Sequence, residues 1–143
     1  MRLDEGETLI AGRLRIRVVS TPGHPADSMC LVLADRVFTG DTLLRGATGR
    51  TDLPTGDPGE HFDSLQKLKA LPEALEVFPA HDYQGRVSST LQKERQTNPR
   101  LRFTSKDEYV RWLEKLATPA PEWMGKVVEA NYACTQTPGS VWI

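Results

Sequence analysis

Three short turns of small residues constrain this chain more than any other feature, because each follows an apolar stretch and precedes a side chain that can bind metal. They are residues 21–24 (TPGH), 39–41 (TGD) and 79–83 (PAHDY). Glycine, proline and alanine before such a side chain favour a tight turn that displays it at the end of a strand. We therefore expect His24, Asp41 and His81 to meet at one edge of a sheet and to hold a metal ion.

The donor types narrow the chemistry of that site. Imidazole nitrogen from His24 with carboxylate oxygen from Asp41 suits zinc, iron or manganese. Cys30 and Cys134 are the only cysteines, so a structural thiolate zinc site is not expected, and their separation favours two reduced thiols. The remaining histidine, His61, lies beside Glu60 at an expected helix start and is interpreted as a solvated residue without a role.

Hydrophobic periodicity predicts strands in the first part of the chain. They are expected over residues 14–18, 28–33, 36–39 and 75–79, with a turn at 34–35. Residues 45–59 are rich in Gly, Thr, Asp and Pro and are predicted to form a long loop of the kind that carries function.

Helices are predicted after that loop. The first expected helix carries Leu65, Leu68 and Leu71 and is closed by Pro72. The second covers residues 88–96 and ends at Asn98-Pro99. The third begins with a capping box at Ser105–Glu108, and its expected buried face contains Tyr109, Trp112, Leu113 and Leu116. Trp123 is also expected in the core. The mixture of strands and helices predicts an α/β (α+β) fold in one compact unit.

Composition excludes some partners. The chain has 143 residues and a net charge of −1, and its basic residues are scattered, which argues against nucleic acid and acidic membranes. No apolar stretch reaches the roughly 18 residues of a membrane span, and the first residues lack the apolar core of a secretory signal. The sequence therefore predicts a cytoplasmic protein with small-molecule partners.

These motifs resemble a known superfamily. Residues 21–24 and 38–43 (FTGDTL), with the later His81, are similar to the second half of the metallo-β-lactamase fold as it appears in glyoxalase II. Within that superfamily, residues 49–52 (GRTD), 79–83, 98–101 (NPRL) and 130–138 resemble the persulfide dioxygenases, also called sulfur dioxygenases. The resemblance implies that residues 1–143 form a single partial domain, the C-terminal half of an αββα sandwich, without the family's opening His-x-His-x-Asp-His motif.

The resemblance also implies a cofactor. One Fe(II) per site would be held by His24, Asp41 and a histidine of the absent motif, which leaves three coordination positions open. Zinc is the alternative metal. His81 would lie beside the iron without binding it, or would bind a second metal as in glyoxalase II.

The implied reaction is the oxidation of glutathione persulfide by molecular oxygen to sulfite and glutathione, in sulfide metabolism. His81 and Tyr83 are the expected catalytic residues, and Arg50, Tyr83 and Arg100 the expected substrate-binding residues, because guanidinium groups bind carboxylates bidentately. Each has a plainer alternative: Arg50 in a loop ion pair with Asp52, Arg100 on the solvated surface, and Tyr83 in the core.

Two other functions stay open. The first is a glyoxalase II-like thioester hydrolase, in which two metals share Asp41 and activate water. The second is an inactive truncated remnant. Because the absent half would cover apolar surface, we expect the isolated chain to be marginally stable, to self-associate, or to pair with a partner that supplies the missing histidines.

Overall fold

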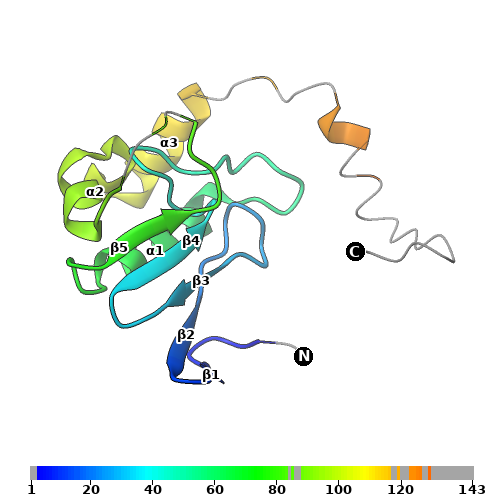
Figure 1. Cartoon of the computed structure of the whole chain (residues 1–143). Helices are drawn as coiled ribbons and strands as arrows, with labels where there is room; N and C mark the ends of the chain where they lie inside the picture. Colours follow the sequence, from blue (N-terminus) through cyan, green and yellow to red (C-terminus); the bar gives the residue numbers. More distant parts are fainter. Residues whose placement is uncertain are drawn as a thin grey trace, which may run out of the picture.

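The computed structural model describes residues 3–83, 85, 88–116, 119, 123–126 and 129. Among these residues, one mixed sheet has the strand order β1-β2-β3-β4-β5. The strands are β1 (Thr8–Ala11), β2 (Leu14–Ser20), β3 (Met29–Val32), β4 (Arg36–Gly40) and β5 (Glu76–Pro79). Strands β1 to β4 pair antiparallel, whereas β5 is parallel to β4 (Figure 1).

Strand β1 was not predicted. Three of its four residues are exposed, so its sequence carries no alternation of buried and exposed side chains. Its place is fixed by backbone pairing with β2, in which Thr8 lies opposite Arg17 and Ala11 opposite Leu14.

The helices begin where polar caps satisfy free backbone amides. They are α1 (Pro58–Lys69), α2 (Leu91–Thr97) and α3 (Lys106–Leu116), with a 3-10 turn, η1 (Pro99–Arg102), between the last two. Asp57 accepts a hydrogen bond of 2.7 Å from the Glu60 amide, so the predicted loop ends at Asp57. Thr90 caps α2, and Asn98 ends it in an extended conformation, as expected before a proline.

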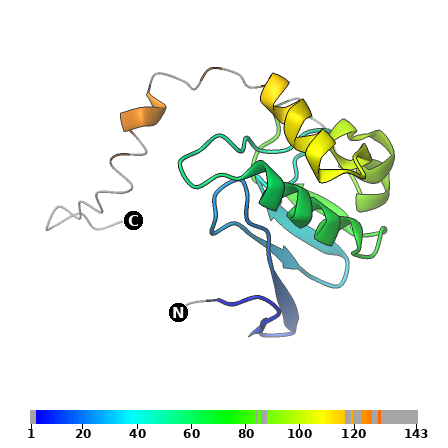
Figure 2. The same ribbon diagram turned by 180° about the vertical axis from the view of Figure 1, so that it is seen from behind.

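The helices cover one face of the sheet. Helix α1 lies behind β4 and β5 in Figure 1 and in front of them in Figure 2, with α3 beside it. The core between these layers contains Val19, Cys30, Val32, Val37, Leu43, Phe62, Leu65, Leu68, Leu75, Val77, Leu91, Leu101 and Tyr109. This architecture confirms the predicted α+β class.

Two expected core residues lie elsewhere. Leu116 is 45% exposed and Trp123 is 62% exposed, so the prediction that they are buried is wrong. Leu116 is the last residue of α3, whereas Tyr109, one turn from its start, is fully buried.

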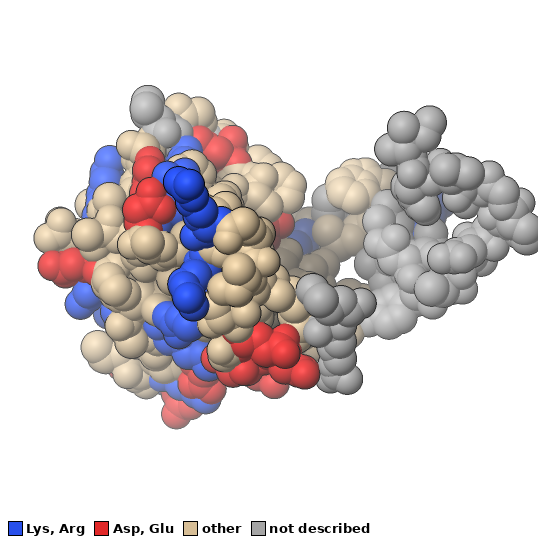
Figure 3. All heavy atoms as spheres, turned by 60° about the horizontal axis from the view of Figure 1, so that its bottom comes forward, with Lys and Arg blue, Asp and Glu red and all other residues tan. Residues whose placement is uncertain are grey.

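The other face of the sheet carries exposed apolar side chains. The Val37–Val77 pair faces the helices, so the neighbouring Phe38–Phe78 pair points to the opposite side. The two Phe rings are 5.5 Å apart, and Phe38 is 41% exposed. In Figure 3, which brings the lower edge of Figure 1 forward, lysine and arginine form a narrow strip bordered by acidic and uncharged side chains.

Within the described residues, no helix combines the length and the apolarity that a membrane crossing requires.

Candidate metal centre

Three turns at one edge of the sheet place their polar side chains together. His24 follows β2, Asp41 follows β4 and His81 follows β5. His24 Nε2 lies 3.6 Å from Asp41 Oδ2, and His81 Nδ1 lies 2.6 Å from Asp41 Oδ1. The structure therefore brings the three predicted residues to a common point, with each carboxylate oxygen of Asp41 facing one imidazole.

Glycines make these turns possible. Gly23 has a φ of +124° and Gly40 a φ of +53°, values that residues with a side chain rarely adopt. The strand pairing between β4 and β5 is irregular between Phe38 and Gly40, and the Ala80 amide donates 2.9 Å to the Gly40 carbonyl. This bond holds the turns that carry Asp41 and His81 side by side.

The orientation of the His24 ring is set by the loop after Asp41. His24 Nδ1 lies 2.7 Å from the Arg50 carbonyl oxygen, which can only accept, so Nδ1 carries the proton. The lone pair of Nε2 is then directed to the Asp41 side. A histidine that binds metal has this arrangement, with one nitrogen fixed by a carbonyl and the other left to coordinate.

His81 and Tyr83 lie at the open side of the site. Their rings stack with centroids 5.6 Å apart and 6° between the planes. The His81 side chain is 53% exposed and Tyr83 is 80% exposed, so Tyr83 is not a core residue. Both rings are accessible to a molecule that approaches the metal centre.

The two predicted arginines line one pocket. It has a volume of about 510 Å³ and is formed by residues 48–52, η1 and the end of α3, including Leu113 and Leu116. Arg50 forms two hydrogen bonds of 2.6 Å with Asp52, which raises the pKa of Arg50 and lowers that of Asp52. The predicted ion pair is present, and Arg50 still lines the pocket.

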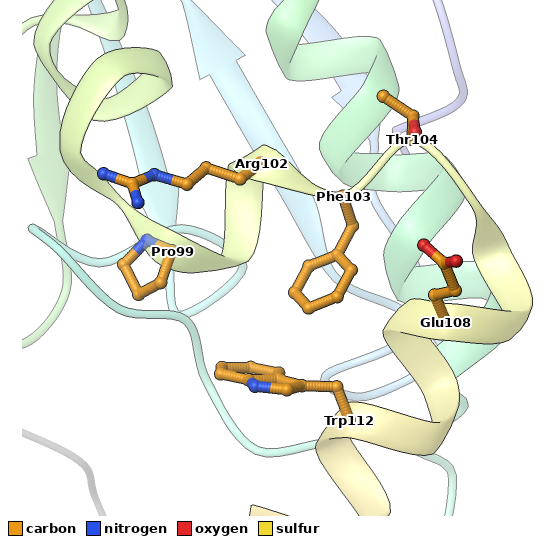
Figure 4. A pocket seen from close by; sticks show the side chains of 6 residues that line it. All are labelled: Pro99, Arg102, Phe103, Thr104, Glu108 and Trp112. Atoms are coloured by element: carbon orange, nitrogen blue, oxygen red, sulfur yellow. The ribbon is translucent and has the colours of Figure 1, made fainter.

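Arg100 is partly buried rather than solvated. Burial lowers the pKa of its guanidinium, which lies over the Trp112 ring at 5.2 Å from the ring centre. Trp112 also meets Phe103 at 5.2 Å, and Figure 4 shows these two rings facing each other between η1 and α3. Among the described residues, no hydrogen-bond partner is found for the buried Arg100 Nε.

His61 is fully buried, so its interpretation as a solvated residue is wrong. Its Nδ1 lies 2.7 Å from the Tyr109 hydroxyl and its Nε2 lies 3.0 Å from the Thr42 carbonyl. Burial lowers its pKa to about 4, and burial raises the pKa of Tyr109 to about 12. The spacing of His61 with Leu65 and Leu68 on one helix face was the sequence signal for burial.

Buried hydroxyls and a thiol lie beneath the turns. Thr21 Oγ1 is 3.1 Å from Thr42 Oγ1 and 3.4 Å from Cys30 Sγ. Cys30 is a free thiol whose pKa burial raises to about 11, as expected for a reduced cysteine. Cys134 and the family-like residues 130–138 lie outside the described residues.

Glu94 is a second buried polar residue that the sequence analysis did not predict. Glu94 is 2% exposed and accepts hydrogen bonds from the Gly46 amide at 2.7 Å and from Asn98 Nδ2 at 3.0 Å. Asn98 Nδ2 also donates to the carbonyls of Leu44 and Ala47. Helix α2 thereby fixes the start of the loop that leads to Arg50.

Comparison with known proteins places this arrangement in a family. The profile of the metallo-β-lactamase superfamily matches residues 2–81, which include His24, Asp41 and His81. The chain belongs to the metallo-β-lactamase superfamily. Membership implies metal binding and agrees with the resemblance found in the sequence.

Relatives within this superfamily include persulfide dioxygenases. The chain is 37% identical over 142 residues to the mitochondrial persulfide dioxygenase ETHE1 of Bos taurus, covering 96% of this chain and 56% of the relative. The crystal structure of ETHE1 from Myxococcus xanthus superposes with a TM-score of 0.84 and 40% identity, covering 93% of this chain and 60% of that one. This metallo-β-lactamase chain thus spans a little over half the length of these relatives.

A second similar structure is a metal complex. The crystal structure of TTHA1623, described as a di-iron-bound form, has a TM-score of 0.61 and 37% identity and covers 69% of this chain and 47% of that chain. In that protein the fold holds two iron ions.

Proposed function

We propose that this chain is the metal- and substrate-binding part of an iron-dependent persulfide dioxygenase that oxidises glutathione persulfide to sulfite and glutathione. The observation that carries this proposal is the His24–Asp41 pair, 3.6 Å apart, with His24 Nδ1 bound to the Arg50 carbonyl. The similarity to persulfide dioxygenases over 96% of the chain supports the reaction class.

The donor set fits a ferrous ion. His24 and Asp41 supply the imidazole and the carboxylate of a two-histidine, one-carboxylate site, and His81 orients the carboxylate through its 2.6 Å contact. Within the part of the chain that the structure describes, no group of three or more side chains is placed to hold a metal ion together. The proposal therefore takes the second histidine from outside these residues, as the resemblance implies. When bound, iron supplies the oxygen-activating redox chemistry, and zinc is the alternative occupant.

The adjoining pocket fits a substrate with carboxylates. Arg50 and Arg100 both line it, and glutathione carries two carboxylates that guanidinium groups bind well. Asp52 holds Arg50 in place, and Trp112 supports the partly buried Arg100 from one side. His81 and Tyr83 at the open side of the site would contact the persulfide end and move protons there.

The experiment is metal analysis and oxygen uptake on the full chain. Iron at one ion per site with oxygen consumption on glutathione persulfide supports the proposal, and Asp41→Asn should abolish both. Metal-free protein without activity, even with iron supplied under reducing conditions, would instead support the inactive remnant.

A second candidate, a thioester hydrolase with two metals, is favoured by one observation. Each carboxylate oxygen of Asp41 faces a different imidazole, which is the arrangement expected of a carboxylate shared by two metals. Two metals per chain with hydrolysis of S-lactoylglutathione, and no oxygen uptake, would favour this function over the dioxygenase.

We further propose that the uncovered sheet face mediates self-association or binds a partner that supplies the third ligand. Phe38 and Met29 are 41% and 39% exposed on strands β4 and β3, which lie side by side. Cytoplasmic localisation stays a prediction: the Bos taurus relative is named mitochondrial, and cell fractionation distinguishes the compartments.

A further inference from the structure

We propose that His61, a buried residue of helix α1, is a positioning residue that holds the His24 turn and the Asp41 turn at a fixed separation. This inference rests on the proposed metal site, because it concerns the two turns that would present the ligands. His61 is not one of the proposed ligands, because both of its ring nitrogens are engaged by Tyr109 and Thr42.

The side chain of His61 holds the Asp41 turn. Its Nε2 lies 3.0 Å from the carbonyl oxygen of Thr42, the residue directly after Asp41. A carbonyl can only accept, so Nε2 donates and Nδ1 accepts from the Tyr109 hydroxyl at 2.7 Å. The Thr42 carbonyl therefore fixes the tautomer of His61, and the Tyr109 hydroxyl of α3 donates to the other ring nitrogen.

The backbone around His61 holds the other turn. Gly23, directly before His24, lies so close to the His61 backbone that a Cβ at position 23 would collide with it. Ser64 Oγ donates 2.7 Å to the Pro22 carbonyl, and the Asp57 amide donates 3.0 Å to the Gly23 carbonyl. The first two turns of α1 thus contact both ligand-bearing turns.

The separation of these turns matters for metal binding. Ligand atoms must approach a metal to about 2.0–2.2 Å, so small displacements of the turns cost affinity. Apart from α1, the described contacts between the two turns include the 3.1 Å pair of Thr21 and Thr42 hydroxyls. Residues that only orient ligands typically change metal affinity about 10–100-fold when replaced.

A purely structural role for His61 makes a different prediction. Leu68, on the same helix and also fully buried, packs only in the core cluster. If His61 merely filled space, leucine would replace it well, and any loss of metal affinity would follow the loss of stability. If His61 positions the turns, metal affinity should depend on the hydrogen-bond donor to the Thr42 carbonyl and not on the global stability of the variant.

The test compares three variants of the full chain. His61→Leu removes the donor, His61→Gln keeps an amide donor near the place of Nε2, and Leu68→Ala is the control for lost core packing. The first readout is the affinity for cobalt(II), a spectroscopic probe, from its visible absorption. The second is hydrogen exchange of the Gly49 and Asp57 amides, whose bonds to the Asp41 and Gly23 carbonyls brace the two turns.

We expect His61→Leu to weaken cobalt binding about 10-fold or more and to speed exchange at both amides beyond the change in global stability. His61→Gln should restore affinity close to that of the unchanged chain, and Leu68→Ala should lower stability without this local effect.

The proposal is overturned if His61→Leu leaves both readouts unchanged, or if Leu68→Ala at matched stability changes them as much. Failure of the unchanged chain to bind cobalt would count against the proposed metal function, and the exchange data alone would then decide the positioning role.

Discussion

His24 Nδ1 lies 2.7 Å from the carbonyl oxygen of Arg50, so the loop that lines the pocket also orients the proposed metal ligand. The Gly49 amide adds a bond of 2.7 Å to the Asp41 carbonyl. One short segment, residues 49–50, therefore contacts both ligand-bearing turns and carries a pocket residue. A substrate that shifts this loop would also shift the ligands.

Replacing Gly49 should disturb both ligands at once. A Cβ at this position would lie 2.5 Å from the Asp41 carbonyl oxygen and 2.6 Å from His24 Nδ1. We expect Gly49→Ala to weaken cobalt(II) binding by about 10-fold or more, as for other residues that support ligands. Gly125→Ala, where no atom lies within 4 Å, is the matched control and should bind like the unchanged chain.

Asp41→Asn should remove a ligand while keeping the shape of the side chain. We expect a larger loss of metal affinity than the about 10–100-fold typical of supporting residues. Calorimetric titration measures it, and Asp27→Asn, at an exposed site, is the control. Equal affinity in Asp41→Asn and the unchanged chain would remove Asp41 from the ligand set.

The buried His61 should make stability depend on pH. Its pKa falls from 6.5 to about 4 on folding, so the unfolded chain binds the proton more tightly. Its contribution is fully present above pH 6.5 and is lost as the pH falls toward 4, by about 3 kcal/mol in total. Urea unfolding between these pH values measures the slope, which should be smaller in His61→Gln.

The buried Glu94 side chain should stabilise the fold. Its buried carboxylate accepts bonds from the Gly46 amide and the Ser89 hydroxyl, and alanine would leave both donors without this acceptor. We expect Glu94→Ala to lower the free energy of unfolding by about 1–3 kcal/mol. Urea unfolding measures it, and Glu108→Ala, at an exposed position of α3, should cost clearly less.

Self-association should depend on the uncovered sheet face. Phe38→Lys places a charge in that face and should raise the monomer fraction in sedimentation velocity. Ile10→Lys is the control, because Ile10 is 61% exposed but its strand position points to the helix side. An unchanged association state in Phe38→Lys would show that copies of the chain do not meet there.

The sequence predicted the parts of the site that depend on local pattern. Glycine or alanine before His24, Asp41 and His81 predicted that these residues follow strand ends, and the structure brings them together. Strand β1 was missed because it is held by pairing with β2 rather than by burial.

The hydrogen-bond partners of the buried polar residues could not be predicted from local pattern. His61 meets Thr42 and Tyr109, and Glu94 meets Gly46, across long sequence separations that no periodicity reveals. Polar residues next to charged neighbours, such as His61 after Glu60, favour a surface interpretation when read alone. Hydrogen bonds to distant partners satisfy these polar side chains and allow them to be buried instead.

Because Cys30 is buried, the rate at which its thiol is chemically labelled should report local opening of this edge of the sheet. Its sulfur is sealed beneath the hydroxyl of Thr21 and next to the Thr39 carbonyl, so an alkylating reagent can reach it only after those strand ends separate. The rate of alkylation would then measure how often this region opens. A metal ion bound by residues at these strand ends should lower that rate.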